Sequence, residues 1–188
     1  MAPKAKITKE QIISAGLELV RKEGEEGMNV RAVAAVLGCS TQPIMSHYAT
    51  VKELQADIYD RADAFHSEYL MGIPEDSDPM LSIGMNYIRF AVEEKHLFRF
   101  LFQSDKFKTG VGELLASEAL VPIIKPLAQG AQLSETQARD VFETLFICAH
   151  GIASLLANNS MEFDEKYCER LLTNAFMGAV GYMKGGNL

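Results

Sequence analysis

Residues 38–48, with the sequence GCSTQPIMSHY, place several small polar side chains on what reads as a short helix. The polar members are Thr41, Gln42, Ser46 and His47. Hydroxyl, amide and imidazole groups of this size can bond to phosphate oxygens or to base edges in the major groove of DNA. The Gln42 amide can pair with adenine N6 and N7, and Met45 can lie against a thymine methyl group. This pattern is typical of a helix that reads DNA, and the alternative is an ordinary solvated helix surface.

A short apolar helix is expected directly before this segment. Val33, Ala34 and Leu37 recur at helical spacing. Gly38 then allows a tight turn with positive φ, and Ser40 is expected to be the N-cap of the next helix.

Pro43 fits the same interpretation. Counting from Ser40 it is the third helical position, inside the first turn, where its missing N–H has no intrahelical partner to lose. Ile44 and Tyr48, four residues apart, are expected to face the core. Two short helices joined by a sharp turn predict a helix-turn-helix.

The rest of the chain also predicts helices, and no convincing strand alternation is found. Capping boxes at residues 8–11 and 134–137 mark the starts of two helices. The expected spans are 8 to 24, 29 to 38, 40 to 48, 50 to 70, 79 to 92, 97 to 102, 111 to 120, 134 to 158 and 164 to 184. Pro122 and Pro126 are expected to break or bend the helix around 111–120. The fold class predicted is all-α.

The composition is that of a folded protein, and the cysteines favour a reducing compartment, the cytoplasm. The 188 residues are 48% hydrophobic and 23% charged, and the three cysteines show no CxxC spacing. No signal-peptide pattern and no run of about 18 apolar residues is found, so no membrane segment is expected. The net charge is −7, yet residues 1–52 carry +2 and residues 53–188 carry −9. Only the N-terminal end is therefore expected to meet a polyanion.

The segment NVRAVAAVLGCSTQPIMSHYATVKEL resembles the DNA-binding domain of the tetracycline-repressor (TetR) family of transcriptional regulators. The similarity covers about residues 8–60 and includes Leu37-Gly38, the Ser40 cap and the pair His47-Tyr48. Two positions depart from the family pattern. Met45 stands where many members have a Tyr that touches phosphate, and Val51 separates the helix cap from Lys52.

The resemblance implies a helix-turn-helix DNA-binding domain at 1–50 and a helical ligand-sensing and dimerisation domain at 51–188. Asn29 and Arg31 are expected to meet phosphate, and Lys4, Lys6 and Lys9 to form a basic arm. The residues expected to contact DNA are Asn29, Arg31, Ser40, Thr41, Gln42, Pro43, Met45, Ser46, His47, Tyr48 and Lys52.

The C-terminal part is rich in aromatic residues, which allow an apolar pocket for a small effector. The pocket residues expected are Phe65, Tyr69, Met85, Tyr87, Phe102, Phe107, Phe142, Phe146 and His150. The last two predicted helices carry small residues that permit close helix approach, and these predict a homodimer. The small residues are Ala149, Gly151, Ala153, Ala157, Ala175, Gly178, Ala179 and Gly181, with Leu155, Leu171, Leu172 and Phe176 supplying area to bury. The two DNA-binding domains of such a dimer, with their recognition helices about 34 Å apart, would then bind a pseudo-palindromic operator.

Two other function classes are alternatives to a DNA-binding regulator. An enzyme is not expected, because the chain has no GxSxG, P-loop, HExxH or dinucleotide motif and its four histidines lack metal-ligand spacing. No cofactor or metal is expected. The second alternative is a helical adaptor that keeps the helix-turn-helix only as a scaffold. The operator, the effector and the choice between repression and activation are not determined by the sequence, although repression is the usual mode in the family.

Overall fold

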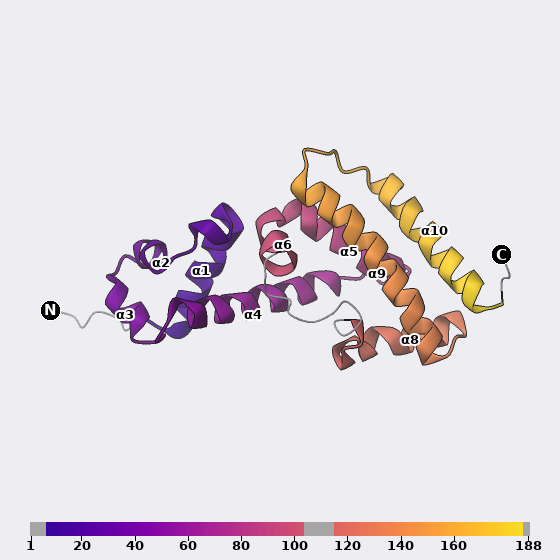
Figure 1. Ribbon diagram of the computed structural model, residues 1–188, viewed down its shortest axis with the longest axis horizontal. Helices are drawn as coiled ribbons and strands as arrows, with labels where there is room; N and C mark the ends of the chain where they lie inside the picture. The colour runs from indigo at the N-terminus through magenta and orange to yellow at the C-terminus, as the bar shows by residue number, and fades with distance from the viewer. Residues whose placement is uncertain (1–6, 104–114, 186–188) are drawn as a thin grey trace. The chain divides into compact units, whose positions relative to one another are not determined.

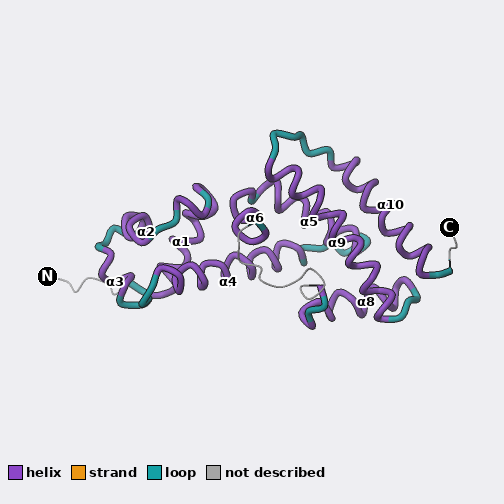
Figure 2. Tube along the Cα trace, viewed as in Figure 1, coloured by secondary structure: helices purple, strands orange, loops and turns teal. Residues whose placement is uncertain are grey.

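The structure, a computed structural model, describes residues 7–103 and 115–185. Every regular element within these residues is helical, which confirms the all-α prediction (Figures 1 and 2). The helices are α1 (Lys9–Glu23), α2 (Val30–Val36), α3 (Thr41–Met45), α4 (Val51–Leu70), α5 (Pro79–Glu93), α6 (Lys95–Phe102), α8 (Val121–Ala131), α9 (Glu135–Asn158) and α10 (Glu165–Met183), with 3-10 turns at Glu25–Gly27 and Glu118–Leu120.

The chain divides into two compact units. The first unit comprises Met1–Glu68 and Glu94–Lys106, and the second comprises Tyr69–Glu93 and Phe107–Leu188. Helix α6 therefore belongs with the N-terminal helices, although it follows α5 in the chain. The functional division at residue 50 stays a prediction, because compactness does not by itself assign a task to either part.

Side-chain caps fix where most helices begin. The Thr8 and Ser134 hydroxyls each accept the N–H of the residue three positions on, and both capping boxes are complete. Asn29, Thr50 and Asp164 cap α2, α4 and α10 in the same way, which confirms these predicted starts.

Ser40 is different. Its backbone has the extended conformation of an N-cap, but its hydroxyl accepts no bond from α3. Ser40 is therefore the N-cap of α3 as predicted, but without a side-chain hydrogen bond. The sharp turn before it is as expected, because Gly38 has a φ of 62° and takes the left-handed conformation that glycine adopts without strain.

The two prolines near residue 120 do not end a helix. Pro122 lies in the first turn of α8, where its missing N–H costs no intrahelical bond, and Pro126 lies inside the helix. Helix α8 therefore continues past Pro126, and the expected break or bend of the helix around 111–120 stays a prediction. Burial of Ile124, Leu127 and Ala128 in a core shared with α9 compensates for the bond that Pro126 cannot make. The predicted helix around 111–120 lies mostly outside the described residues.

The core of the first unit joins α1 to α4 and α6. Ile12, Leu54 and Ile58 are fully buried. Gly16 lets α1 and α4 approach closely, because a Cβ there would clash with Ile58 Cδ1. A bidentate ion pair from Arg61 to Glu10, with N–O distances of 2.6 and 2.8 Å, joins the same two helices at the surface.

In the second unit, α9 packs against α5, α8 and α10. By length and composition α9 could cross a membrane, but the core helix of a soluble protein meets the same two criteria. Its Ala149, Ala153 and Ala157 are buried within this unit. These three, like Leu172, were predicted to face a second chain, and that prediction was wrong.

A histidine is buried in the core of the first unit. The His66 side chain on α4 is 6% exposed and lies edge-to-face with Phe102 of α6, with ring centroids 5.0 Å apart. Burial lowers the pKa of His66 to about 4, because the imidazolium would lose its hydration.

This buried imidazole predicts a pH-dependent stability. Because the pKa in the folded state lies below the ordinary value of 6.5, the contribution is complete above pH 6.5 and is lost as the pH falls toward 4. We expect this group to lower the free energy of unfolding by up to about 1.4 kcal/mol per pH unit in that window. Urea denaturation of the wild type and of His66→Phe at several pH values measures the difference. Parallel pH profiles for the two proteins would contradict this expectation.

Candidate nucleic-acid interface and apolar cavity

Helix α3 is held in place by its neighbours. It has five residues, far fewer than a helix needs for stability on its own. Ile44 is fully buried and Tyr48, just beyond the helix, is 4% exposed, so both face the core as predicted. These two side chains leave the opposite face of α3 exposed.

A polar cluster anchors Tyr48. Its hydroxyl donates to Asp57 Oδ2 at 2.8 Å, and Lys9 Nζ lies 2.7 Å from the same oxygen. Lys9 also lies over the Tyr48 ring, 5.4 Å from its centroid. The bond from Lys9, followed by that from Tyr48, lowers the pKa of the Asp57 carboxyl, whereas burial and the bond to Asp57 raise the pKa of Tyr48. The cluster joins α1, α4 and the end of α3 within the first unit.

Two expectations change as a result. Tyr48 is buried and its hydroxyl is used internally, so it positions α3 and does not present a group to DNA. Lys9 is the first residue of α1 and is paired with Asp57, so it is not part of an extended arm. Lys4 and Lys6 lie outside the described residues.

The exposed face of α3 carries Thr41, Gln42 and Met45, and Met45 is 41% exposed. Within the described part of the chain, the side chains of Thr41 and Gln42 make no hydrogen bond, so these groups are available to a partner. The exposed Ser46 differs, because its hydroxyl donates to the Pro43 carbonyl at 2.7 Å. Thr41, Gln42 and Met45 are therefore the side chains of α3 that remain available to a partner.

Other expected contact residues surround this surface. His47 Nε2 lies 3.0 Å from the Ile7 carbonyl oxygen, which places the start of the described chain beside α3. The Asn29 side chain accepts the N–H groups of Arg31 and Ala32 at 3.1 and 3.0 Å, so its oxygen is used as a helix cap. The remaining expected contacts are Arg31, Ser40 and Lys52, which are exposed, and Pro43, which is half-buried.

The residues of the predicted aromatic pocket do not all belong to one unit. Phe65 and Phe102 belong to the first unit, and Phe107 lies outside the described residues. The other six belong to the second unit: Tyr69, Met85, Tyr87, Phe142, Phe146 and His150.

Four of those six pack on one another between α5 and α9. The Tyr87 hydroxyl lies 2.8 Å from His150 Nδ1, and Phe146 meets both rings at centroid distances of 5.7 Å. Phe142 stacks beyond Phe146 at 6.4 Å. Burial lowers the pKa of His150 and raises that of Tyr87, which favours a neutral hydrogen-bonded pair.

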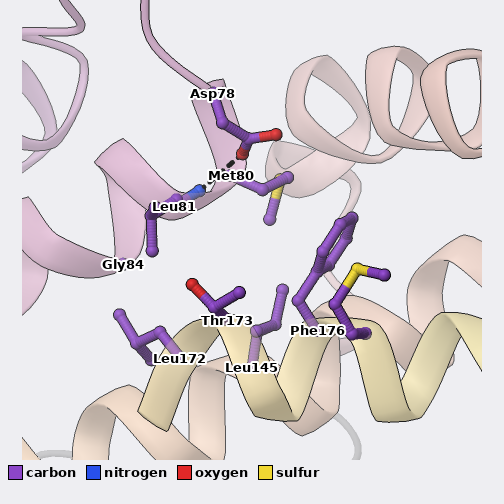
Figure 3. A pocket seen from close by; sticks show the side chains of 9 residues that line it. Asp78, Met80, Leu81, Gly84, Leu145, Leu172, Thr173 and Phe176 are labelled. Atoms are coloured by element: carbon purple, nitrogen blue, oxygen red, sulfur yellow. Dashed lines mark hydrogen bonds between the residues drawn. The ribbon is translucent and has the colours of Figure 1, made fainter. Parts of the chain in front are cut away.

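A cavity of about 240 Å³ lies elsewhere in the second unit, between α5, α9 and α10 (Figure 3). Its lining residues are Asp78, Met80, Leu81, Gly84, Leu145, Leu172, Thr173, Phe176 and Met177. None of the eight described members of the predicted pocket lines it, so the predicted lining was wrong for this cavity. The rings at Tyr87 and Phe146 contact one another, whereas mainly aliphatic and sulfur-containing side chains border the open space.

Asn86 has a structural role that the sequence analysis did not predict. It is buried on α5, and its amide donates to the carbonyls of Leu70 and Gly72, each at 3.2 Å, at the end of α4. Its oxygen accepts a bond from Arg89 at 3.0 Å, and Arg89 pairs with Glu165 at the start of α10. The end of α4 is thus joined through α5 to α10. An Asn within an otherwise apolar helix was the sequence signal for this role, because a polar side chain buried there needs hydrogen-bond partners.

Residues 80–175 match the model of the "Tetracyclin repressor-like, C-terminal domain" family, which is half of the chain. The chain belongs to the TetR family. It is a transcriptional regulator of the TetR type, as the resemblance of residues 8–60 implied.

Individual relatives of this TetR-family chain are distant in sequence. The uncharacterized HTH-type transcriptional regulator YobS of Bacillus subtilis (strain 168) is 21% identical over 174 residues, covering 91% of this chain and 90% of the relative. The crystal structure of a transcriptional regulator from Rhodococcus sp. RHA1 has a TM-score of 0.65 at 14% identity, covering 96% and 100% of the two chains. A TetR-like transcriptional regulator from the same organism gives 0.63 at 17% identity, covering 95% and 96%. These structures support the fold.

The anchoring of α3 yields a test by single substitution. Tyr48→Phe removes one buried hydroxyl and leaves the ring, so we expect a loss of about 1 kcal/mol in the free energy of unfolding. Tyr167→Phe is the matched control, because Tyr167 is 50% exposed and its substitution should change stability little. Urea denaturation of both variants gives the comparison. Equal stability of the two variants would mean that the bond to Asp57 does not stabilise the first unit.

Proposed function

We propose that the protein is a homodimeric repressor that binds a pseudo-palindromic DNA operator and is released by a small, largely apolar effector. The observation that carries the DNA-binding part is the exposed face of α3. Ile44 and Tyr48 bury one side of this helix, while Thr41, Gln42 and Met45 remain exposed on the other. A short helix held this way can enter a major groove without rearrangement of its side chains.

Each exposed group then has a task suited to its chemistry. Gln42 reads adenine through its amide, and Met45 contacts a thymine methyl group. Thr41 bonds to a base or a phosphate. Arg31 and Lys52 supply positive charge to the phosphate backbone, which gives affinity without sequence preference.

Dimerisation through α9 and α10 is supported by apolar groups that the second unit leaves exposed. On α9, Ile147 and Leu155 are 53% and 54% exposed and Gly151 lies between them at helical spacing. On α10, Met177 and Tyr182 are more than 60% exposed, and a Cβ at the nearby Gly178 would meet no other atom within 4 Å. Glycine in an exposed helix lowers helix stability, so its presence favours a close approach by a second chain. Two α3 helices in one dimer would then reach successive major grooves.

For an effector to release the protein from DNA, it must favour one arrangement of the two DNA-binding domains of the dimer. A ligand that binds the DNA-free state ten to a hundred times more tightly supplies roughly 1.4–2.8 kcal/mol per site. The bonds of Asn86 to the end of α4, and of Arg89 to Glu165 on α10, offer a route by which changes in the second unit reach α4. The aromatic cluster around Tyr87 and His150 stays our proposed contact surface for an effector, and we place the protein in the cytoplasm with its DNA.

A second function, that of a helical adaptor, has one observation in its favour. Val36, Met45 and Val51 of the first unit are each at least 41% exposed. Apolar groups on a helix-turn-helix surface can contact a protein partner as well as thymine methyl groups. The salt dependence and base preference of DNA binding distinguish these functions.

We first expect substitutions of Gln42 and of Arg31 to change DNA binding in different ways. After selection of bound sequences from random DNA, Gln42→Ala should relax the preference at one base pair of each half-site, costing about 1–3 kcal/mol for the preferred base. Arg31→Ala should weaken all sequences alike and reduce the salt slope. Gel-shift titrations at several salt concentrations measure both effects. Binding to no DNA duplex at low salt would refute the proposal and leave the adaptor.

The dimer is tested separately. Leu155→Glu places a charge on the exposed apolar face of α9 while leaving the core intact, so we expect the protein to become monomeric and to lose at least tenfold in operator affinity. Gln129→Glu adds the same charge at an exposed position of α8 and should remain dimeric. Light scattering distinguishes one 20.7-kDa chain from two. If both variants have the mass of the wild type, α9 is not the dimer interface.

A further inference from the structure

The cavity between α5, α9 and α10 combines an apolar interior with two polar groups at its edge. Seven of its nine lining residues carry no polar side-chain group, with Leu145 and Leu172 buried at its base. The two polar members are Asp78, at the start of α5, and Thr173 on α10. Figure 3 shows the Thr173 side chain pointing from α10 toward α5, across the space bordered by Met80 and Phe176.

The Asp78 carboxylate is only partly used by the fold. One oxygen, Oδ1, accepts the Leu81 N–H at 2.9 Å and so caps α5. Among the described residues, no Lys, Arg or His side chain forms an ion pair with Asp78. The positive end of the α5 dipole offsets part of the charge. A carboxylate oxygen at the edge of an apolar cavity remains available to a donor from outside the chain.

We propose that this cavity binds a small amphipathic cation. The aromatic or aliphatic body of the ligand lies against Leu145, Leu172 and Phe176, and its ammonium group donates to the free oxygen of Asp78. An ammonium group suits this position because it supplies the positive charge and the hydrogen-bond donors that the carboxylate requires.

The size of the cavity limits the ligand. An apolar cavity of about 150 Å³ is large enough for benzene, and the volume here is about 240 Å³. A ligand with one aromatic ring and a two-carbon amine side chain therefore fits.

The site shares one residue, Met177, with the surfaces used in the proposed function. It shares no residue with the reading face of α3 or with the Tyr87–His150 cluster. On α10 it uses Thr173, Phe176 and Met177, and of these three only Met177 is also among the exposed residues that support the proposed dimer. Ligand binding here can thus be measured on the full chain without any DNA.

The test uses three probes of nearly equal size: phenethylamine as the cation, 2-phenylethanol as the neutral molecule and phenylacetate as the anion. Methionine methyl groups labelled with ¹³C report the location, because Met80 and Met177 line the cavity and Met45 lies in the first unit. NMR titration of the full chain at pH 7 yields an affinity and a position together. We expect shifts at Met80 and Met177 and none at Met45.

Three variants isolate the contacts. Asp78→Asn removes the charge but keeps an equally good N-cap for α5. Asp76→Asn is the matched control, because it removes one carboxylate from the same loop without lining the cavity. Thr173→Phe fills the cavity from an exposed position of α10, so the fold should tolerate it.

We expect phenethylamine to bind about five- to tenfold more tightly than 2-phenylethanol, and phenylacetate to bind most weakly. Asp78→Asn should remove the advantage of the amine, Asp76→Asn should retain it, and Thr173→Phe should abolish the shifts at Met80 and Met177. Equal affinities for the three probes, an unchanged preference in Asp78→Asn, or shifts that persist in Thr173→Phe would each overturn the proposal. Absence of any shift with phenethylamine would do the same. DNA binding enters none of these outcomes, so the proposed function and this site can fail independently.

Discussion

The position of α3 depends on the burial of Ile44 and Tyr48 and on the hydrogen bond from Tyr48 to Asp57. Five residues form too few internal hydrogen bonds to hold a helix in water, so the surrounding core of α1, α2 and α4 must supply the stability. Lys9 balances the charge of Asp57, which keeps the carboxylate ionised where it accepts the bond from Tyr48. The orientation of every group on the exposed face of α3 follows from this anchoring.

The same anchoring separates the polar side chains near α3 into two kinds. Asn29 and Ser46 satisfy backbone groups of the protein itself, and Tyr48 satisfies Asp57. Thr41 and Gln42 have no such internal task among the described residues, so they differ from neighbours of similar polarity. The modest +2 charge of residues 1–52, against −9 for the rest, means that attraction to DNA would act on this end of the chain alone.

The second unit uses its polar groups to connect helices and its aromatic groups to fill space. Asn86 holds the end of α4, Arg89 joins Asn86 to Glu165, and the Tyr87–His150 pair places its hydrogen bond among aromatic rings. The cavity lies beyond these contacts, where Asp78 and Thr173 stand at the edge of an otherwise apolar space. Asp78 has two positions at once, because it caps α5 and also borders the cavity.

The sequence by itself determined the helices and most of their starts, together with the helix-turn-helix layout and the inward direction of Ile44 and Tyr48. These features depend on residues three or four apart, such as Thr8 with Gln11 and Ser134 with Gln137, and such spacings are visible along the chain. The absence of a Ser40 side-chain cap and the continuation of α8 past Pro126 were not visible, because neighbouring helices outweigh local preference there.

Only the tertiary structure decided which aromatic residues meet, which small residues of α9 face inward, and where a cavity remains. Asp78 and Thr173 are far apart in the sequence, and the space between them depends on how α5, α9 and α10 pack. Packing of this kind is set by the shapes of many side chains at once, so no short pattern in the sequence specifies it.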